Sequence, residues 1–190
     1  MRSLTAIMLA ALLILALAAA AHAEDFSLLG GRVAFTAPGD WLIQGRDQGD
    51  ASESLVLIVP FAPTAGTEAV ATATFAAWDN PEQMDAEEFV TPMLEETLEL
   101  PGSTLISDAG DETWRLTFLR ADHEGTPYLV AECYALTPQT MAWFRLEWPD
   151  VAPEREAVLA LGNQVLGSLQ VDGALAPPSL RLDPGTLPGE

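Results

Sequence analysis

The sequence predicts an α+β domain in which a mainly antiparallel sheet of about six strands is covered by helices. Short runs rich in β-branched and aromatic residues alternate with turns made of glycine, proline, aspartate and serine, which is typical of strands with short connections. Two segments have the periodicity of an amphipathic helix instead. The later strands carry large apolar side chains on both faces, so we expect the sheet to be covered on both faces.

The first half of the domain is expected to contain three strands, over residues 33–36, 55–61 and 69–78. The first runs into the turn Pro38-Gly39-Asp40-Trp41. Proline presets the backbone φ of such a turn, glycine relieves its crowding, and aspartate bonds to the backbone. We interpret the turn as a structural corner with Trp41 in the core, and not as a site of chemistry.

An amphipathic helix is predicted over residues 84–98, where the apolar side chains share one stripe and most glutamates lie off it. Asp85 is placed to cap the first turn, with Glu88 three residues later as its return partner. Pro92 lacks the N–H that would bond back to residue 88. We therefore expect a kink, or a restart of the helix at Thr91.

Three further strands are predicted over residues 113–121, 128–136 and 141–148, and their short connections suit an antiparallel meander. A second helix over residues 153–169 supplies part of the cover for the sheet. Residues 172–190 contain so much proline and glycine that we expect them to be disordered.

The N-terminus has the pattern of a signal peptide. Arg2 precedes an apolar run over residues 7–17, and Ala21-His22-Ala23 fits the small-residue cleavage pattern. The run is shorter than the roughly 20 residues needed to span a bilayer. Glu24 stands where a lipoprotein would carry its acylated cysteine. We expect residues 1–23 to be removed and a soluble chain without a membrane anchor to reach the periplasm, with secretion as the alternative.

The chain is strongly acidic, with eight arginines and no lysine against 28 carboxylates. Arg2 would leave with the signal peptide while every carboxylate follows Ala23, so the mature side chains would carry 7 − 28 = −21 charges. Such a field repels nucleic acids and anionic lipids, and we expect neither as a partner. Solubility or adaptation to salt is the favoured explanation of this acidity, and recognition of a basic partner is the alternative.

Residues 24–171 are long enough for one domain that buries about 70% of its unfolded surface, and we expect a monomer. Cys133 is the only cysteine, so an internal disulfide is excluded. If residues 113–136 form a hairpin, His123 lies at its tip, about 30 Å from Cys133 at about 3.3 Å per residue. That separation excludes a Cys–His nucleophile pair, and we interpret Cys133 as a small buried hydrophobe.

Several enzyme classes are excluded by the residues that the chain lacks. Without lysine there is no Walker A loop, no Ser-x-x-Lys acylase and no Schiff-base enzyme. The G-x-S-x-G, G-x-G-x-x-G and H-E-x-x-H motifs are also missing. A carboxylate pair of the glycosidase type stays open with so many acids available. Nothing singles out two of them, so we assign no catalytic residue and no cofactor.

Two acidic stretches are candidates for a metal site. The carboxylates near His123 in the sequence or in the predicted hairpin are Asp122, Glu124, Asp108, Asp111 and Glu112. They lack a recognised ligand spacing, and we expect a solvated hairpin tip. Residues 47–53 faintly resemble a calcium loop, but Gly49 and Ile58 stand where the EF-hand pattern requires ligands. We expect a flexible acidic loop there and assign no metal ligand.

The order of the elements resembles the PsbP-like fold, an α/β/α sandwich around an antiparallel sheet, and within it the DcrB-like bacterial envelope proteins. The matching residues are Val33–Phe35, Pro38-Gly39-Asp40-Trp41, Met84–Phe89 and Ser168-Leu169. The similarity extends over nearly all of residues 26–171.

The resemblance implies protein binding without catalysis. Similar domains serve as extrinsic photosystem subunits, as a nuclear-transport cofactor that binds a small GTPase, as secretion-effector chaperones and as envelope proteins. The signal peptide argues against a nuclear or cytosolic role here, and the missing cysteine after it differs from the lipoprotein members. A single histidine after the signal peptide gives no reason to transfer a metal site.

These observations together predict a non-enzymatic periplasmic accessory protein that binds another envelope protein. The alternative is a small-ligand or metal-binding protein that uses the acidic loops, and a carboxylate-based hydrolase is the third possibility.

Overall fold

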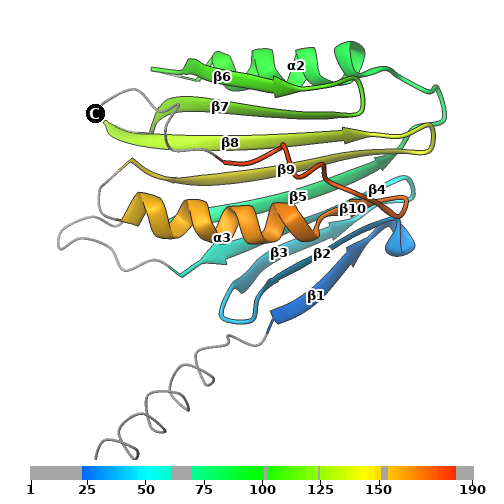
Figure 1. Cartoon of the computed structure of the whole chain (residues 1–190), viewed down its shortest axis with the longest axis horizontal. Helices are drawn as coiled ribbons and strands as arrows, with labels where there is room; N and C mark the ends of the chain where they lie inside the picture. The colour runs from blue at the N-terminus through cyan, green and yellow to red at the C-terminus, as the bar shows by residue number, and fades with distance from the viewer. Residues whose placement is uncertain (1–22, 61–69, 101, 124, 151–153, 183–190) are drawn as a thin grey trace, which may run out of the picture.

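The computed structural model describes residues 23–60, 70–100, 102–123, 125–150 and 154–182. Residues 1–22 of the predicted signal peptide lie outside this part of the chain, as do residues 183–190 of the predicted tail. Figure 1 shows a large sheet with one helix lying across it, a second helix near one edge and a smaller sheet beside the opposite edge.

The large sheet has seven strands in the order β3-β4-β5-β9-β8-β7-β6, and every neighbouring pair is antiparallel (Figure 1). The strands are β3 (Leu42–Gln48), β4 (Ser52–Val59), β5 (Ala71–Asp79), β6 (Thr104–Gly110), β7 (Trp114–His123), β8 (Thr126–Leu136) and β9 (Thr140–Pro149). The predicted antiparallel meander is confirmed as β7, β8 and β9. The two edge strands, β3 and β6, were not predicted.

The small sheet has the order β1-β2-β10-β11. Its members are β1 (Ala23–Leu28), β2 (Val33–Pro38), β10 (Gln170–Val171) and β11 (Ala174–Leu175), and a single 3-10 turn, η1 (Leu29–Gly31), joins β1 to β2. The first predicted strand, residues 33–36, therefore belongs to this second sheet. The prediction of one sheet of about six strands is corrected to a seven-stranded sheet beside a four-stranded one.

Helix α2 (Ala86–Leu98) begins with the predicted capping box. The Glu88 N–H donates to Asp85 Oδ1 at 2.9 Å, and the Asp85 N–H donates to Glu88 Oε2 at 3.4 Å. The expected restart at Thr91 is not seen, since the helix continues through Pro92. Proline removes one backbone hydrogen bond, but the packing of the apolar stripe on the sheet holds the flanking turns together.

Helix α3 (Glu154–Ser168) covers the opposite face of the large sheet. Ser168 ties the end of this helix to the small sheet, because its Oγ accepts the Thr36 N–H at 2.9 Å. Gly162 allows a close approach, since a Cβ there would lie 2.5 Å from side-chain carbons of Leu146 on β9 and of Leu182. Within the described residues, no helix combines the length and apolarity needed to cross a membrane.

Residues 172–182 differ from the predicted disordered tail. They form β11 and then run along α3, where Leu180 and Leu182 are buried. The Asn163 side chain holds this segment, because its amide donates to the Leu182 carbonyl at 2.9 Å and its Oδ1 accepts the Leu182 N–H at 2.8 Å. Composition alone misled the prediction, since a few leucines and one helical asparagine suffice to order a proline-rich segment.

The main core lies between the large sheet, α3 and the small sheet. A row of stacked phenylalanines crosses it: Phe26 of β1, Phe35 of β2, Phe75 of β5 and Phe144 of β9. Trp41 is buried in the same core, and its backbone N–H donates to the Pro38 carbonyl at 3.1 Å. The interpretation of this turn as a structural corner is confirmed.

Candidate functional site

Strand β3 exposes the two most accessible large hydrophobic side chains among the described residues, Leu42 (62% exposed) and Ile43 (58%). They are neighbours, so in a strand they point to opposite faces of the sheet. The strand is the last of the large sheet, and one of its sides has no partner in the sheet order (Figure 1). We call residues 42–48 the β3 edge.

The sheet surface beside Leu42 is also incompletely covered. Leu42 pairs with Ile58 of β4, and Ile58 pairs with Thr72 of β5. Both Ile58 and Thr72 are half-buried, whereas their chain neighbours on the other face are buried in the main core. Helix α2 packs instead around Tyr134 and the strands near the β6 side. An apolar strip thus continues from the β3 edge across β4.

The turn that ends the β3 edge is stabilised by an ion pair between the exposed Arg46 and the buried Glu53. Glu53 accepts a hydrogen bond from Arg46 Nε at 2.8 Å and another from the Leu29 N–H at 2.7 Å. Burial alone would raise the pKa of Glu53, but these hydrogen bonds and the positive charge of Arg46 outweigh it and lower the pKa below its usual value. The pair neutralises the one cation of β3 and joins the hairpin to the small sheet.

Residues 47–53, which we expected to form a flexible acidic loop, instead contain a tight hairpin turn between β3 and β4. The Gly49 N–H donates to the Ser52 carbonyl at 2.8 Å. The stretch lacks an open ring of ligands because Glu53, its last carboxylate, is turned into the core and paired with Arg46. The carboxylates that stay exposed are Asp47 and Asp50.

A second group of charged residues lies between α2 and the sheet. Glu132 of β8 is completely buried, accepts a hydrogen bond from the Tyr134 hydroxyl at 2.7 Å, and lies 3.2 Å from Thr97 Oγ1 of α2. Arg145 of β9 approaches Glu132 at 3.4 Å and pairs with Glu147 at 3.0 Å. Burial raises the pKa of Glu132, while Tyr134, Arg145 and Thr97 oppose the shift.

A small pocket of about 260 Å³ opens beside this group. Its lining residues are Met93, Glu96, Thr97, Leu100, Trp143 and Arg145. The guanidinium that faces it is already shared by two carboxylates, Glu132 and Glu147. The arrangement therefore fixes α2 on the sheet and leaves no cation free to bind an anion.

The structure separates His123 from two of the carboxylates of the candidate metal site, Asp111 and Glu112. His123 ends β7, whereas Asp111 and Glu112 precede its first residue, about 30 Å away at about 3.3 Å per residue. His123 lies against Tyr128, with ring centroids 4.9 Å apart, and its Nε2 is 2.6 Å from Glu147 Oε1. Glu124 lies outside the described residues. In the part of the chain that the structure describes, no three histidine, cysteine or acidic residues are grouped to hold a metal.

Cys133 lies on the core face of β8 and is buried, as predicted. Burial raises the pKa of its thiol to about 12, so the reactive thiolate is suppressed at neutral pH. This side chain packs in the core and takes no part in the β3 edge.

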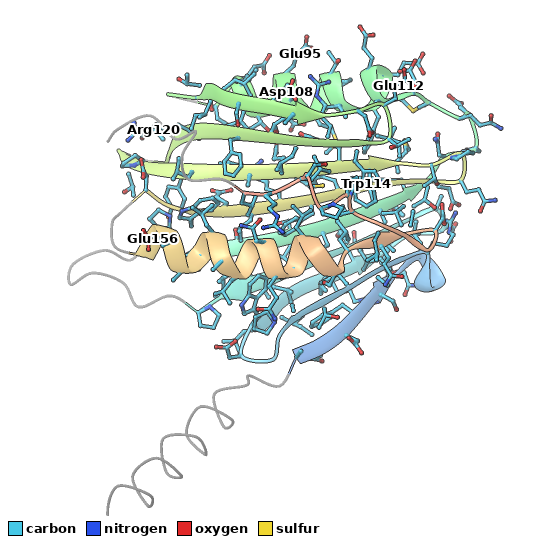
Figure 2. All side chains as sticks on the ribbon, in the orientation of Figure 1. Glu95, Asp108, Glu112, Trp114, Arg120 and Glu156 are labelled. Carbon is cyan, nitrogen blue, oxygen red and sulfur yellow. The ribbon has the colours of Figure 1, made fainter. Side chains whose placement is uncertain are left out.

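An open pocket of about 700 Å³ lies where α2 begins beside the β6–β7 hairpin. It is lined mainly by carboxylates, and Figure 2 shows Glu95, Asp108 and Glu112 near this edge of the molecule. Arg115 pairs with Asp108 at 2.8 Å, and Asp111 accepts the backbone N–H groups of Thr113 and Trp114. These contacts stabilise the hairpin, and they do not gather the carboxylates around one point.

Sequence reasoning missed the β3 edge and the pair formed by the buried Glu132 and the half-buried Arg145. Residues 42–48 are mostly polar or glycine and show no alternation of apolar side chains, so the strand signal is absent. A signal for Glu132 was available: it shares a strand face with Val130, Tyr134 and Leu136 in an otherwise apolar stretch. An acid at such a position must find a partner.

The fold is shared with the Ran-binding protein Mog1p of Saccharomyces cerevisiae, with a TM-score of 0.55 over 80% of this chain and 97% of Mog1p. The two sequences are 12% identical, so this likeness concerns the fold alone. The chain has a Mog1/PsbP-like fold. The expected fold resemblance is confirmed at that level, and the narrower similarity to DcrB-like proteins stays a prediction.

Two further solved structures are similar over much of their length. LpqN of Mycobacterium tuberculosis, involved in cell envelope biogenesis, has a TM-score of 0.49 at 15% identity, over 78% of this chain and 91% of LpqN. PA94 of Pseudomonas aeruginosa, a putative regulator, has a TM-score of 0.44 at 17% identity, over 75% of this chain and 94% of PA94. No protein-family model and no curated protein matches the sequence.

Proposed function

We propose that this protein is a non-enzymatic accessory protein of the bacterial envelope that binds another protein through the β3 edge. One observation carries the proposal: Leu42 and Ile43 are both exposed, one on each face of the terminal strand of the large sheet. Large exposed apolar side chains on a sheet edge favour contact with another chain.

The arrangement of the polar groups supports a binding role over catalysis. Glu53, Glu132 and Glu147 are each engaged with an arginine, Arg46 or Arg145. An enzyme needs such groups to converge on a site that a substrate can enter. Here they join elements of the fold to one another.

Two further observations support protein binding in the bacterial envelope. Mog1p, which has the same fold, is a Ran-binding protein, so this architecture serves protein recognition elsewhere. The N-terminal pattern of a signal peptide supports an envelope partner, and the narrower proposal is a DcrB-like envelope protein.

Site-specific photo-crosslinking in living cells tests the proposal. A photoreactive amino acid replaces Ile43 in the full-length, exported protein, and the matched control replaces Leu175, which is similarly exposed on β11. We expect a discrete protein adduct from position 43 and none from position 175. Identical adducts from both positions, or none from position 43, would contradict the proposal.

A further inference from the structure

We infer that the β3 edge binds an extended, basic segment of its partner as an additional antiparallel or parallel strand of the large sheet. This inference rests on the proposed function and adds the mode of binding and the chemistry of the partner. Backbone N–H and C=O groups along an unpaired edge are ready to bond to such a strand, and pockets for alternate side chains supply selectivity.

Among the sheet edges that the structure describes, the β3 edge carries the two most exposed large hydrophobic side chains, and the two-residue β11 edge carries one, Leu175. At the opposite edge, Leu105 of β6 is 39% exposed, the next residue, Ile106, is half-buried, and the rest of the strand is polar or small. In β1, the exposed positions include Glu24 and Asp25. Leu42 and Ile43 lie on opposite faces of β3, so an added strand would cover apolar surface on both faces at once.

The charges around the β3 edge favour a basic segment. Asp40 precedes the strand, Asp47 lies within it and Asp50 follows it, and all three are exposed. Arg46, the one cation of the strand, is neutralised by Glu53. The local surface is therefore negative, within a chain whose formal net charge is −20.

The same charges disfavour a second copy as the occupant. Pairing β3 with β3 of another molecule would bring two sets of aspartates together between two strongly acidic chains. A register shift between Ile43 and Gly45 also divides the strand. Bulges and charges of this kind prevent self-association of edges, whereas a short strand with lysine or arginine side chains would be attracted.

The structure indicates how the added strand would lie. Gly45 to Gln48 keep an unbroken register with Val56 to Glu53 of β4, so this portion of β3 is regular enough to pair on its outer side. The apolar pair at Leu42 and Ile43 precedes the bulge and offers side-chain contacts. A segment with apolar residues near one end and basic residues along its length fits both portions.

The probe is a labelled synthetic peptide, Val-Lys repeated four times, titrated against the full mature chain at low salt. We expect binding, slower amide hydrogen exchange of residues 42–48, and about tenfold weaker affinity for Ile43→Ser and Leu42→Ser, because each loses buried apolar contact. The matched control Leu175→Ser should bind like the wild type. These serine substitutions leave the charge unchanged, and thermal unfolding checks that each variant is folded.

Two control peptides separate strand addition from simple charge attraction. A Val-Glu peptide should not bind, and a Val-Lys peptide with alternate N-methyl groups should lose binding because its backbone can no longer donate to the edge. Equal binding of the N-methylated peptide, protection of α2 in place of β3, or self-association of the chain through β3 would overturn the inference.

The two proposals fail differently. If crosslinking at position 43 captures a partner but that complex does not slow exchange of the β3 amides, strand addition is wrong and the proposed function stands. If no partner is captured from position 43 but the peptide binds as described, the proposed function is wrong.

Discussion

Trp41 illustrates how one side chain positions two sheets. It follows the Pro38-Gly39-Asp40 corner, leaves the small sheet and fills the core just before the exposed β3 edge begins. The residue after it, Leu42, is exposed, so the boundary between core and surface falls between two consecutive side chains. The stability of this corner therefore determines where β3 is presented.

Replacing Trp41 by alanine should lower the free energy of unfolding by about 3–5 kcal/mol, because it leaves a large cavity in the main core. Urea unfolding followed by circular dichroism measures the change. Trp41→Phe, which keeps much of the buried volume, serves as the control and should cost clearly less. A loss below about 1 kcal/mol for Trp41→Ala would show that the ring is not required for the fold.

Glu132 should make stability depend on pH. Burial raises its pKa in the folded state, whereas an unfolded glutamate has a pKa of about 4.3. The folded protein therefore holds this proton more tightly. Protonated Glu132 contributes fully to the free energy of unfolding below the pKa of an unfolded glutamate. This contribution is lost as the pH rises through the pKa of Glu132 in the folded protein.

Glu132→Gln keeps the shape and cannot ionise, so the variant should gain stability relative to the wild type as the pH rises from about 4 to about 7. Urea unfolding at a series of pH values measures this difference. Glu95→Gln on the exposed side of α2 is the matched control and should follow the wild type. If the free energies of unfolding of Glu132→Gln and the wild type change in parallel with pH, the raised pKa of Glu132 in the folded protein is contradicted.

At the scale of elements, sequence patterns predicted the strands that are buried on at least one complete face and missed those at edges. Strands β4, β5, β7, β8 and β9 carry the expected apolar runs. β3 and β6 are held by backbone pairing with one neighbour, so their side chains carry no such pattern. Helix α2 was predictable because its cap and its apolar stripe are both local.

The segment after β10 is an element whose order depends on contacts with α3. Truncation after Val171 should lower the free energy of unfolding by at least about 3 kcal/mol, since Leu180 and Leu182 are both buried and each contributes about 1.5–3 kcal/mol. Truncation after Leu182 is the control and should leave stability nearly unchanged. Urea unfolding compares the two, and equal stability would show that the segment adds nothing to the core.

At the scale of the whole molecule, the excess of carboxylates is left largely without cations. In the structure, Arg32, Arg46, Arg115, Arg120 and Arg145 are each paired with an acidic residue. The remaining negative charge faces solvent. It discourages self-association and attracts basic partners from a distance, which agrees with the inferred chemistry of the β3 ligand.

Export is also a property of the whole chain. We expect the protein isolated from the periplasm of its expressing cells to begin at Glu24, because Ala21-His22-Ala23 fits a cleavage pattern. Intact-mass measurement tests this directly. Ala23→Pro blocks such cleavage and is the control, which should accumulate with its leader. A wild-type mass that retains residues 1–23 would contradict the expectation.

Local sequence patterns were enough to predict the α+β fold class, the central meander, both helices, the capping box and the burial of Trp41 and Cys133. The tertiary structure decided which strands lie at the edges, that the Phe26–Phe144 row joins two sheets, and that residues 172–182 are ordered. It also decided that Glu53 is hidden while Leu42 and Ile43 are exposed. The exposure of side chains and the pairing of strands depend on which segments distant in sequence come together. The periodicity within one segment does not show which other segments will pack against it.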